Sequence, residues 1–143
     1  MPTIRIKNNR EGNVLAKLKA TGSKNLTSAI SLQAAKYTLG QVKAGFRKES
    51  DPYGSRWARK QKPDGRKILT GKTKKLKRNF ETRLRLGGGF AIKAATPYAS
   101  FHQDGTRTGL PARMIFPDSR GLPDKWSKKF KSITKAEIKM ISR

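Results

Sequence analysis

The side chains able to perform acid–base or nucleophilic chemistry are few in this chain. Its 143 residues include nine Asp and Glu, one His and no Cys, whereas catalysis needs several positioned groups of suitable pKa. His102, two residues before Asp104, is the one pairing with a spacing typical of acid–base work. A histidine in this setting more often caps a turn or packs against an aromatic neighbour, here Tyr98 or Phe101. We therefore interpret His102 as structural.

Metal and phosphate chemistry lack the usual patterns. The carboxylates are scattered apart from Glu49 and Asp51, and a single histidine without cysteine cannot form a thiolate or multi-histidine site. Gly87–Gly89 is not followed by the Lys-Ser/Thr and helix start of a phosphate loop, so it is read as a hairpin tip. The sequence predicts that the protein is not an enzyme and takes no metal or cofactor.

Charge is the strongest compositional feature. The chain carries 34 Lys and Arg against 9 Asp and Glu, a formal net charge of +25, which is far more than solubility requires. Nucleic-acid phosphates are the first partner to consider, with an anionic membrane or an acidic protein surface as alternatives. Neither a helix-turn-helix nor a basic run interleaved with aromatic residues is visible, so any DNA contact is expected to involve the backbone without sequence preference.

The basic residues are densest between Arg59 and Arg85. This stretch contains twelve Lys and Arg but only two acidic residues, Asp64 and Glu81, which gives a local net charge of +10. Such a run is either a solvated, disordered face or a contact with DNA phosphates or an acidic partner. The candidate contact residues are Arg66, Lys67, Lys72, Lys74, Lys75, Lys77 and Arg78.

Two helices and a hairpin are predicted to position these residues. Apolar residues recur at helical spacing after Ser23, a plausible N-cap, and continue to Phe46 before Asp51-Pro52 ends the helix. A second amphipathic helix, opened by Pro123 and Asp124, should run to about Met140 and bury Trp126.

Alternating residues predict the hairpin. Phe80, Leu84 and Leu86 should share a buried face with the apolar positions of 90–94, across the Gly87–Gly89 tip. Residues 51–78 read as an extended basic loop. Thr3–Lys7 suits a short strand, and Val14–Leu18 is ambiguous between strand and helix.

Two shorter elements follow the hairpin. Tyr98–His102 is expected to form one helical turn, and Met114–Phe116 a further strand. The predicted fold is one α+β domain over residues 1–143: a small, mainly antiparallel sheet packed with a long N-terminal-half helix and a C-terminal amphipathic helix. No apolar run approaches the roughly 20 residues that span a bilayer, and the N-terminus lacks a secretory apolar stretch, so no membrane partner is expected.

Six local features occur in a familiar order between Leu26 and Phe116. They are the helix running into Phe46, Asp51-Pro52-Tyr53-Gly54-Ser55-Arg56-Trp57-Ala58, Ile68-Leu69-Thr70-Gly71 with Leu76, the hairpin with Thr96-Pro97-Tyr98-Ala99, His102-Gln103-Asp104-Gly105, and Leu110-Pro111-Ala112-Arg113. Together they resemble the phage virion morphogenesis, or tail completion, family of contractile-tailed phages such as Mu-like ones. The stretch between Trp57 and Leu69 is more basic than that family pattern.

The motif residues are interpreted as architecture: Tyr53, Gly54, Trp57, Thr70, Gly71, Tyr98, His102, Gly105, Pro111 and Arg113. Pro52 and Gly54 suit a tight turn that returns Trp57 to the long helix, and Gly71 would allow a positive φ. Tyr98 and His102 should lie on one face of their turn.

The resemblance implies a structural protein at the head-proximal end of the tail, acting as a tail completion, terminator or neck ring that enables head–tail joining. It implies a homo-oligomer, a hexameric ring with DNA passing through it, in which Thr106–Leu110 and the N-terminal strand change environment on assembly. The implied partners are tail tube and head-connector proteins, with sheath proteins as a further candidate. The implied location is the virion tail or neck, after assembly in the host cytoplasm.

Two other classes of protein compete with this interpretation. A sequence-nonspecific basic nucleic-acid-binding protein would bind free duplex as a monomer with steep salt dependence. An enzyme or toxin would lose activity, but not its fold, when His102 or a carboxylate is replaced.

Overall fold

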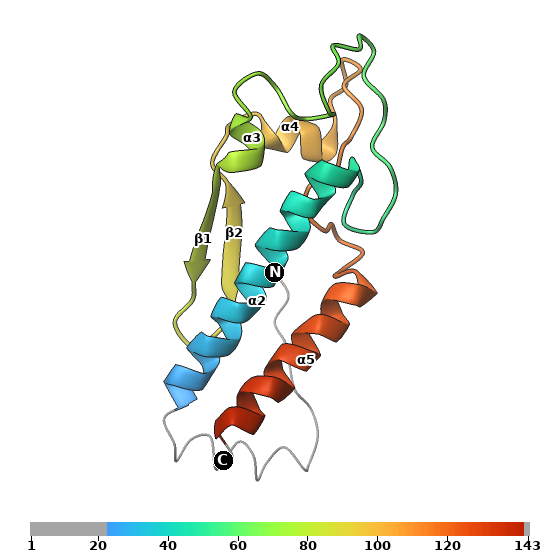
Figure 1. The fold of residues 1–143 in the computed structure, drawn as a ribbon. Coiled ribbons are helices and arrows are strands. Elements are labelled where there is room, and N and C mark those ends of the chain that lie inside the picture. The colour runs from blue at the N-terminus through green and yellow to red at the C-terminus, as the bar shows by residue number, and fades with distance from the viewer. Residues whose placement is uncertain (1–22, 142–143) are drawn as a thin grey trace.

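A computed structural model describes residues 23–141 and contains four helices and two strands in this range (Figure 1). In chain order these are α2 (Ser23–Lys48), α3 (Lys75–Arg78), β1 (Phe80–Leu84), β2 (Phe90–Ala94), α4 (Ala99–Asp104) and α5 (Asp124–Ile141). The predicted α+β class with two long helices is confirmed. The predicted strand at Thr3–Lys7 and the ambiguous segment Val14–Leu18 lie outside the described residues.

Helix α2 forms the centre of the molecule, with the β1–β2 hairpin on one side and α5 on the other (Figure 1). Its buried positions, Leu26, Ala34, Val42 and Phe46, follow the helical spacing on which the prediction was based. The chain leaves the helix at Glu49, which has a φ of 55°, shortly before the predicted stop at Asp51-Pro52.

The hairpin pairs β1 and β2 antiparallel, from Phe80 opposite Ala94 to Leu84 opposite Phe90. Phe80 packs edge-on against Phe46, with ring centroids 6.1 Å apart. The glycine tip rests on α2, because the Gly89 N–H donates to the Ser31 hydroxyl at 2.8 Å. The predicted hairpin and its tip are therefore confirmed.

The prediction that Leu86 shares the buried face of the hairpin is wrong, since its side chain is fully exposed. Strand β1 ends at Leu84, and a hydrogen bond of 3.0 Å from the Arg85 N–H to the Gly89 carbonyl closes the turn that contains Leu86. The alternation therefore stops before Leu86. The prediction is also wrong for Leu84, which is 45% exposed, so the β1 side of the hairpin is only thinly covered.

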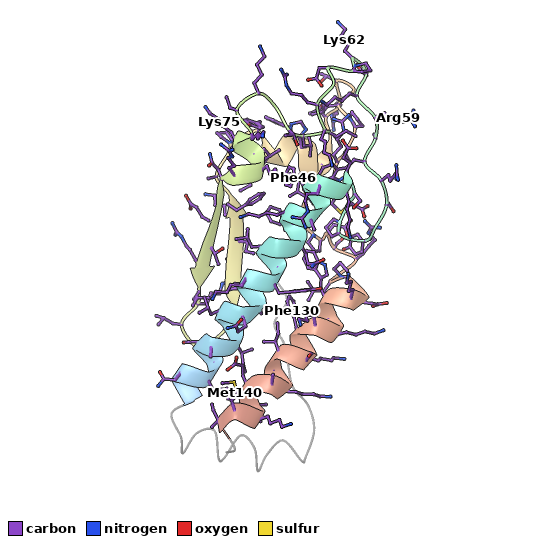
Figure 2. The ribbon with its side chains drawn as sticks, in the orientation of Figure 1. Phe46, Arg59, Lys62, Lys75, Phe130 and Met140 are labelled. Carbon is purple, nitrogen blue, oxygen red and sulfur yellow. The ribbon has the colours of Figure 1, made fainter. Side chains whose placement is uncertain are left out.

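Helix α5 packs along α2, where the buried Phe130 meets Tyr37 edge-on with ring centroids 6.1 Å apart (Figure 2). Trp126 is buried as well. The Pro123 carbonyl accepts the N–H groups of Trp126 and Ser127 at the start of the helix, as the Pro-Asp opening predicts. Met140 does not join the buried face, because it lies at the far end of the helix and is 69% exposed (Figure 2).

Residues Met114–Phe116 do not form the predicted strand. Their backbone groups bond to side chains instead of a neighbouring strand. The Gln103 amide oxygen accepts the N–H groups of Ile115 and Phe116 at 2.7 and 2.9 Å, and its amide nitrogen donates to the Phe116 carbonyl at 2.8 Å. These bonds satisfy the backbone of a short apolar segment without a sheet.

The basic loop over residues 51–78 is less extended than predicted, since it ends in the one-turn helix α3, which buries Leu76. Gly71 has no positive φ, contrary to expectation. Leu69 takes that conformation, with a φ of 57°, as the third residue of a turn closed by the Thr70 N–H and the Lys67 carbonyl. Gly71 is the first residue of the next turn, where no positive φ is needed.

Candidate functional site

Apart from the hairpin and the N-terminal part of α2, the segments that carry the family resemblance meet at the end of the molecule occupied by α3, α4 and the two long loops (Figure 1). Asp51 accepts the N–H groups of Tyr53 and Ser55 in a tight turn, and Gly54 has a φ of 98°. The chain then returns Trp57 to α2, where its ring packs edge-on against Phe46 with centroids 5.5 Å apart. The predicted turn and the placement of Trp57 are confirmed.

Arg113 holds this end of the molecule together from a buried position. Its side chain donates from Nε to the Ala58 carbonyl at 2.9 Å and from Nη2 to the Arg59 carbonyl at 3.0 Å. The residue is only 7% exposed, yet no ion pair within residues 23–141 includes it. A buried guanidinium is thus held by carbonyl oxygens, without a compensating carboxylate from the described residues.

His102 lies beside Arg113 and packs against Tyr98, with ring centroids 6.1 Å apart and nearly perpendicular planes. The prediction that the two share one face is confirmed. Burial, and secondarily the charge of Arg113, lower the pKa of the imidazole, which favours its neutral form. Its Nδ1 atom is buried and has no hydrogen-bond partner in the described part of the chain.

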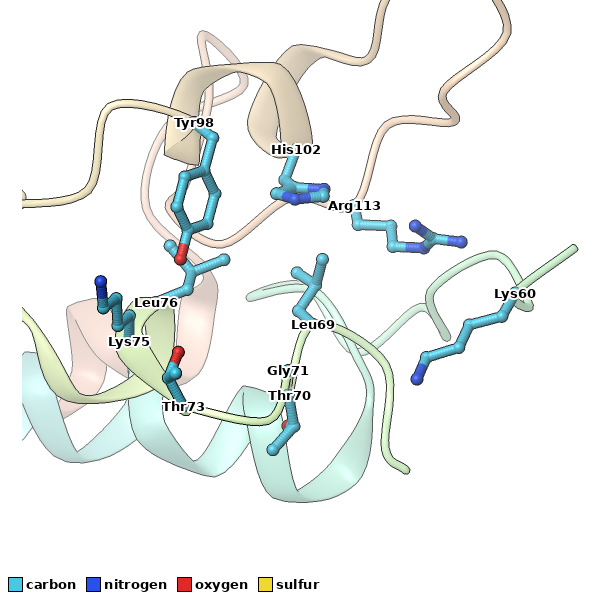
Figure 3. Close-up of a pocket in the computed structure, with 10 residues that line it drawn as sticks. All are labelled: Lys60, Leu69, Thr70, Gly71, Thr73, Lys75, Leu76, Tyr98, His102 and Arg113. Atoms are coloured by element: carbon cyan, nitrogen blue, oxygen red, sulfur yellow. The ribbon is translucent and has the colours of Figure 1, made fainter. Parts of the chain in front are cut away.

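A pocket of about 270 Å³ opens between α3, α4 and the loop before α3 (Figure 3). Leu69 and Leu76 provide its apolar wall. The polar lining consists of basic side chains and hydroxyl groups: Lys60, Lys75, His102, Arg113, Thr70, Thr73 and Tyr98. No carboxylate lines it, so the pocket suits an anionic group with an apolar stem.

A second hollow of about 340 Å³ adjoins the first and shares Lys60 and Arg113 with it. Its other lining residues, which also include no carboxylate, are Gln61, Lys62, Thr108, Gly109, Leu110 and Pro111. Lys60 does bond to the exposed Asp64, with Nζ 2.6 Å from the carboxylate, so part of its charge is already compensated.

The candidate contact residues do not all have free charges. Arg66 pairs with Asp64 at 3.4 Å, and the Lys67 ammonium donates to the Arg47 carbonyl at 2.6 Å. The side chains of the Lys72–Arg78 run surround α3, and all of its cations except the half-buried Lys77 are exposed. Of these candidates only Lys75 lines the pocket.

Sequence reasoning missed Lys60 and Lys62 as site residues. Both belong to the basic run counted above, but nothing in their spacing separates them from its other cations. Figure 2 places Arg59, Lys62 and Lys75 at the same end of the molecule. Lys60 and Lys62 line a hollow because residues 108–113 fold back against the loop that carries them.

Glu49 and Asp51, the two neighbouring acids considered for a metal site, accept hydrogen bonds from backbone N–H groups. Glu49 accepts the Ile68 N–H at 2.6 Å, and Asp51 closes the turn described above. Within residues 23–141 no group of three His, Cys, Asp or Glu side chains is placed to hold a metal ion. No helix in this range has the length and apolarity needed to cross a bilayer.

Comparisons of the chain with protein-family models, curated proteins and solved structures find no match. The function of the protein is accordingly inferred from its residues and their contacts.

Proposed function

We propose that this chain is a structural phage protein at the head-proximal end of the tail, where it forms a tail completion, terminator or neck ring. One observation carries the proposal. Three of the motifs behind the family resemblance are joined by hydrogen bonds at a single end of the molecule, across as many as 57 positions. Trp57 bonds to Met114, Arg113 bonds to Ala58, and the Arg113 N–H donates to the His102 carbonyl.

The chemistry of this end favours a structural over a catalytic role. Its histidine has a lowered pKa and packs against Tyr98, and the nearby acids Glu49 and Asp51 hold loops in place. The pocket has cations and hydroxyls but no carboxylate that would serve as a general base or a metal ligand. No catalytic role is proposed.

A strand edge and a loop on the surface are suited to head-to-tail contacts between the subunits of a ring. Strand β1 has one neighbour, β2, in the described sheet, so its other edge is open to pairing. Leu84, the last residue of β1, and Leu86, in the turn that follows, are exposed. The Thr106–Leu110 loop extends from the motif end, held by a 2.9 Å hydrogen bond between the Thr106 N–H and the Leu110 carbonyl. Such loops and edges are suited to heterologous contacts, which close into a ring when the rotation allows.

The proposed ring is a hexamer, with tail tube and head-connector proteins as neighbours, sheath proteins as a further candidate, and DNA passing through it. Its place is the virion tail or neck, after assembly in the host cytoplasm. The excess of cations around α3 would face either the passing DNA or an acidic neighbour.

A basic nucleic-acid-binding protein is the second candidate, favoured by the exposed cations of the Lys72–Arg78 run, none of which forms an ion pair in the described structure. This class of protein would bind duplex DNA as a monomer, with an affinity that falls steeply as salt rises.

Light scattering of the purified full-length chain separates the two candidates. The mass is measured at low and high salt, with and without duplex DNA. A DNA-independent ring of about six subunits is expected for the tail protein. A monomer that binds duplex only at low salt would favour the second candidate. Monomers in intact particles, measured by native mass spectrometry, would contradict the ring.

A further inference from the structure

Arg113 carries a positive charge on a buried residue, which is 7% exposed. Removing a guanidinium from water costs several kcal/mol unless an opposite charge and hydrogen bonds offset it. The two carbonyl bonds use two of the five N–H donors of the group, and no carboxylate within residues 23–141 pairs with it. A site that keeps such a charge buried and borders two hollows is suited to receive an anion.

The hollows favour one kind of anion. In the first, Leu69 and Leu76 lie between Lys75 on one side and Arg113 and Lys60 on the other (Figure 3). A carboxylate at the tip of an Asp or Glu side chain enters such a space with its methylene groups against the leucines. A phosphate in a DNA backbone is flanked by sugars on both sides and lies on a convex ridge, so it fits a pocket of about 270 Å³ poorly.

We propose that the two hollows joined by Lys60 and Arg113 bind an acidic segment of a partner protein, with one carboxylate beside Arg113 and His102 and another beside Lys75 on the other side of Leu69 and Leu76 (Figure 3). An extended segment would continue over the second hollow toward Lys62. The Thr73 hydroxyl supplies a further donor, whereas the Thr70 hydroxyl already donates to the Ile68 carbonyl at 3.4 Å.

In the role proposed above, the acidic segment would belong to a neighbouring head-connector protein, and that assignment rests on the proposed function. Binding of an acidic peptide does not rest on it. A ring that forms but binds no acidic peptide would contradict only the present inference, whereas a monomer that binds the peptide in this site would contradict only the ring.

His102 provides a local reporter because it is the only histidine in the chain. Its imidazole signals in a nitrogen-15 correlation spectrum therefore need no assignment. The charged groups that line the same pocket are Arg113, Lys60 and Lys75. A carboxylate seated beside Arg113 and His102 would favour the protonated imidazole and oppose the effect of Arg113.

The test titrates the full-length protein with a hexaglutamate peptide at about 0.15 M salt, where charges more than about 8 Å apart are largely screened. Affinity is measured by calorimetry, and His102 is followed by NMR. The site variant is Lys60→Ala with Lys75→Ala. The control variant, Lys131→Ala with Lys135→Ala on exposed positions of α5, removes the same charge far from the pocket lining.

The site variant is expected to weaken peptide binding about tenfold or more and the control less than about twofold. The wild-type His102 signals should move toward the protonated form as the peptide saturates. Because Lys60 also bonds to Asp64 and the Arg66 carbonyl, Lys75→Glu alone serves as a second variant that spares that loop. Lys75→Glu should weaken peptide binding at least as much as the double variant does.

Equal losses in the site and control variants would overturn the proposal, since the peptide would then recognise only the overall charge. Unchanged His102 signals at saturation would also overturn it. A duplex of about 20 base pairs is the second probe. If the duplex moves the His102 signals and hexaglutamate does not, the pocket takes a phosphate backbone and the protein-partner proposal is wrong.

Discussion

The indole nitrogen of Trp57 donates a 2.9 Å hydrogen bond to the carbonyl oxygen of Met114, 57 positions later in the chain. Beside it, Arg113 bonds to the Ala58 carbonyl. The two loops at the motif end are therefore joined by side chains bonded to backbone, without a shared sheet. The pocket depends on these bonds, because they place the Arg113 segment over the loop that carries Lys60.

Replacing Trp57 should separate its packing role from its hydrogen bond. Trp57→Phe keeps a ring against Phe46 but leaves the Met114 carbonyl without this donor, and should lower the free energy of unfolding by about 1–2 kcal/mol. Trp57→Ala also removes the buried ring and should cost about 3–5 kcal/mol. Urea denaturation measures both changes. Equal losses in the two variants would show that packing is not the larger effect.

Gln103→Ala should destabilise the protein by about 1–3 kcal/mol, because the Ile115 and Phe116 N–H groups and the Phe116 carbonyl would all lose a part-buried partner. Gln103→Glu keeps the acceptor for both N–H groups and should lose less at neutral pH. Hydrogen exchange of those two amides is the most direct measurement. Unchanged protection of both amides in Gln103→Ala would contradict the assigned role.

Gly105 and Gly109 form a matched pair. Both have a positive φ, 75° and 104°, but a Cβ at Gly105 would lie 2.8 Å from the Leu110 carbonyl oxygen, while a Cβ at Gly109 meets nothing within 4 Å. Gly105→Ala should therefore cost at least about 2 kcal/mol and Gly109→Ala about 1 kcal/mol. Similar thermal denaturation midpoints for the two variants would contradict the close approach.

Asp118 should contribute to acid sensitivity. The Arg120 guanidinium, with help from Arg120 N–H and Tyr53 hydroxyl hydrogen bonds, lowers the pKa of its carboxyl to about 2, from 3.8. A depressed folded-state pKa contributes stability that is present above about pH 4 and is lost as pH falls toward 2. The contribution is small because the carboxylate is exposed to solvent.

Thermal denaturation of wild type and Asp118→Asn between about pH 2 and 6 measures this contribution. The midpoints should differ at the upper end, with wild type higher, and converge toward the lower end. Added salt should shrink the difference. A constant difference across the whole range would contradict linkage to this carboxyl.

Changing Lys74, Lys75 and Lys77 together to Glu should leave the chain folded, because Lys74 and Lys75 are exposed, Lys77 is half-buried, and none of the three forms an ion pair in the described structure. It should abolish head–tail joining or DNA passage if the run around α3 faces DNA or an acidic neighbour. The matched control changes Lys125, Lys131 and Lys135 of α5 to Glu. Infectious particles containing the first variant, with normal joining, would remove the basic run from the mechanism.

Several expectations failed where a turn, or a side chain from another segment, fixes the backbone. Met114–Phe116 has the apolar composition of a strand, but the Gln103 side chain forms the hydrogen bonds to the Ile115 and Phe116 backbone that a neighbouring strand would form. Gly71 suits a positive φ by type, yet Leu69 adopts it within a turn fixed by the Lys67 carbonyl. Leu86 continues an alternation that the hairpin turn has already ended. In each case a tertiary or turn contact overrode the local preference.

The sequence by itself determined the two long helices, the hairpin and the excess of cations, because periodicity, glycine and charge act locally and can be read along one segment. It also indicated the burial of Trp57 and the packing of His102 against an aromatic neighbour, Tyr98 or Phe101, of which the structure shows Tyr98. Only the tertiary structure decided that Arg113 lies buried beside Lys60 without a carboxylate from the described chain, and that two hollows meet there. That arrangement depends on bonds between residues more than 50 positions apart, whose pairing no local pattern specifies.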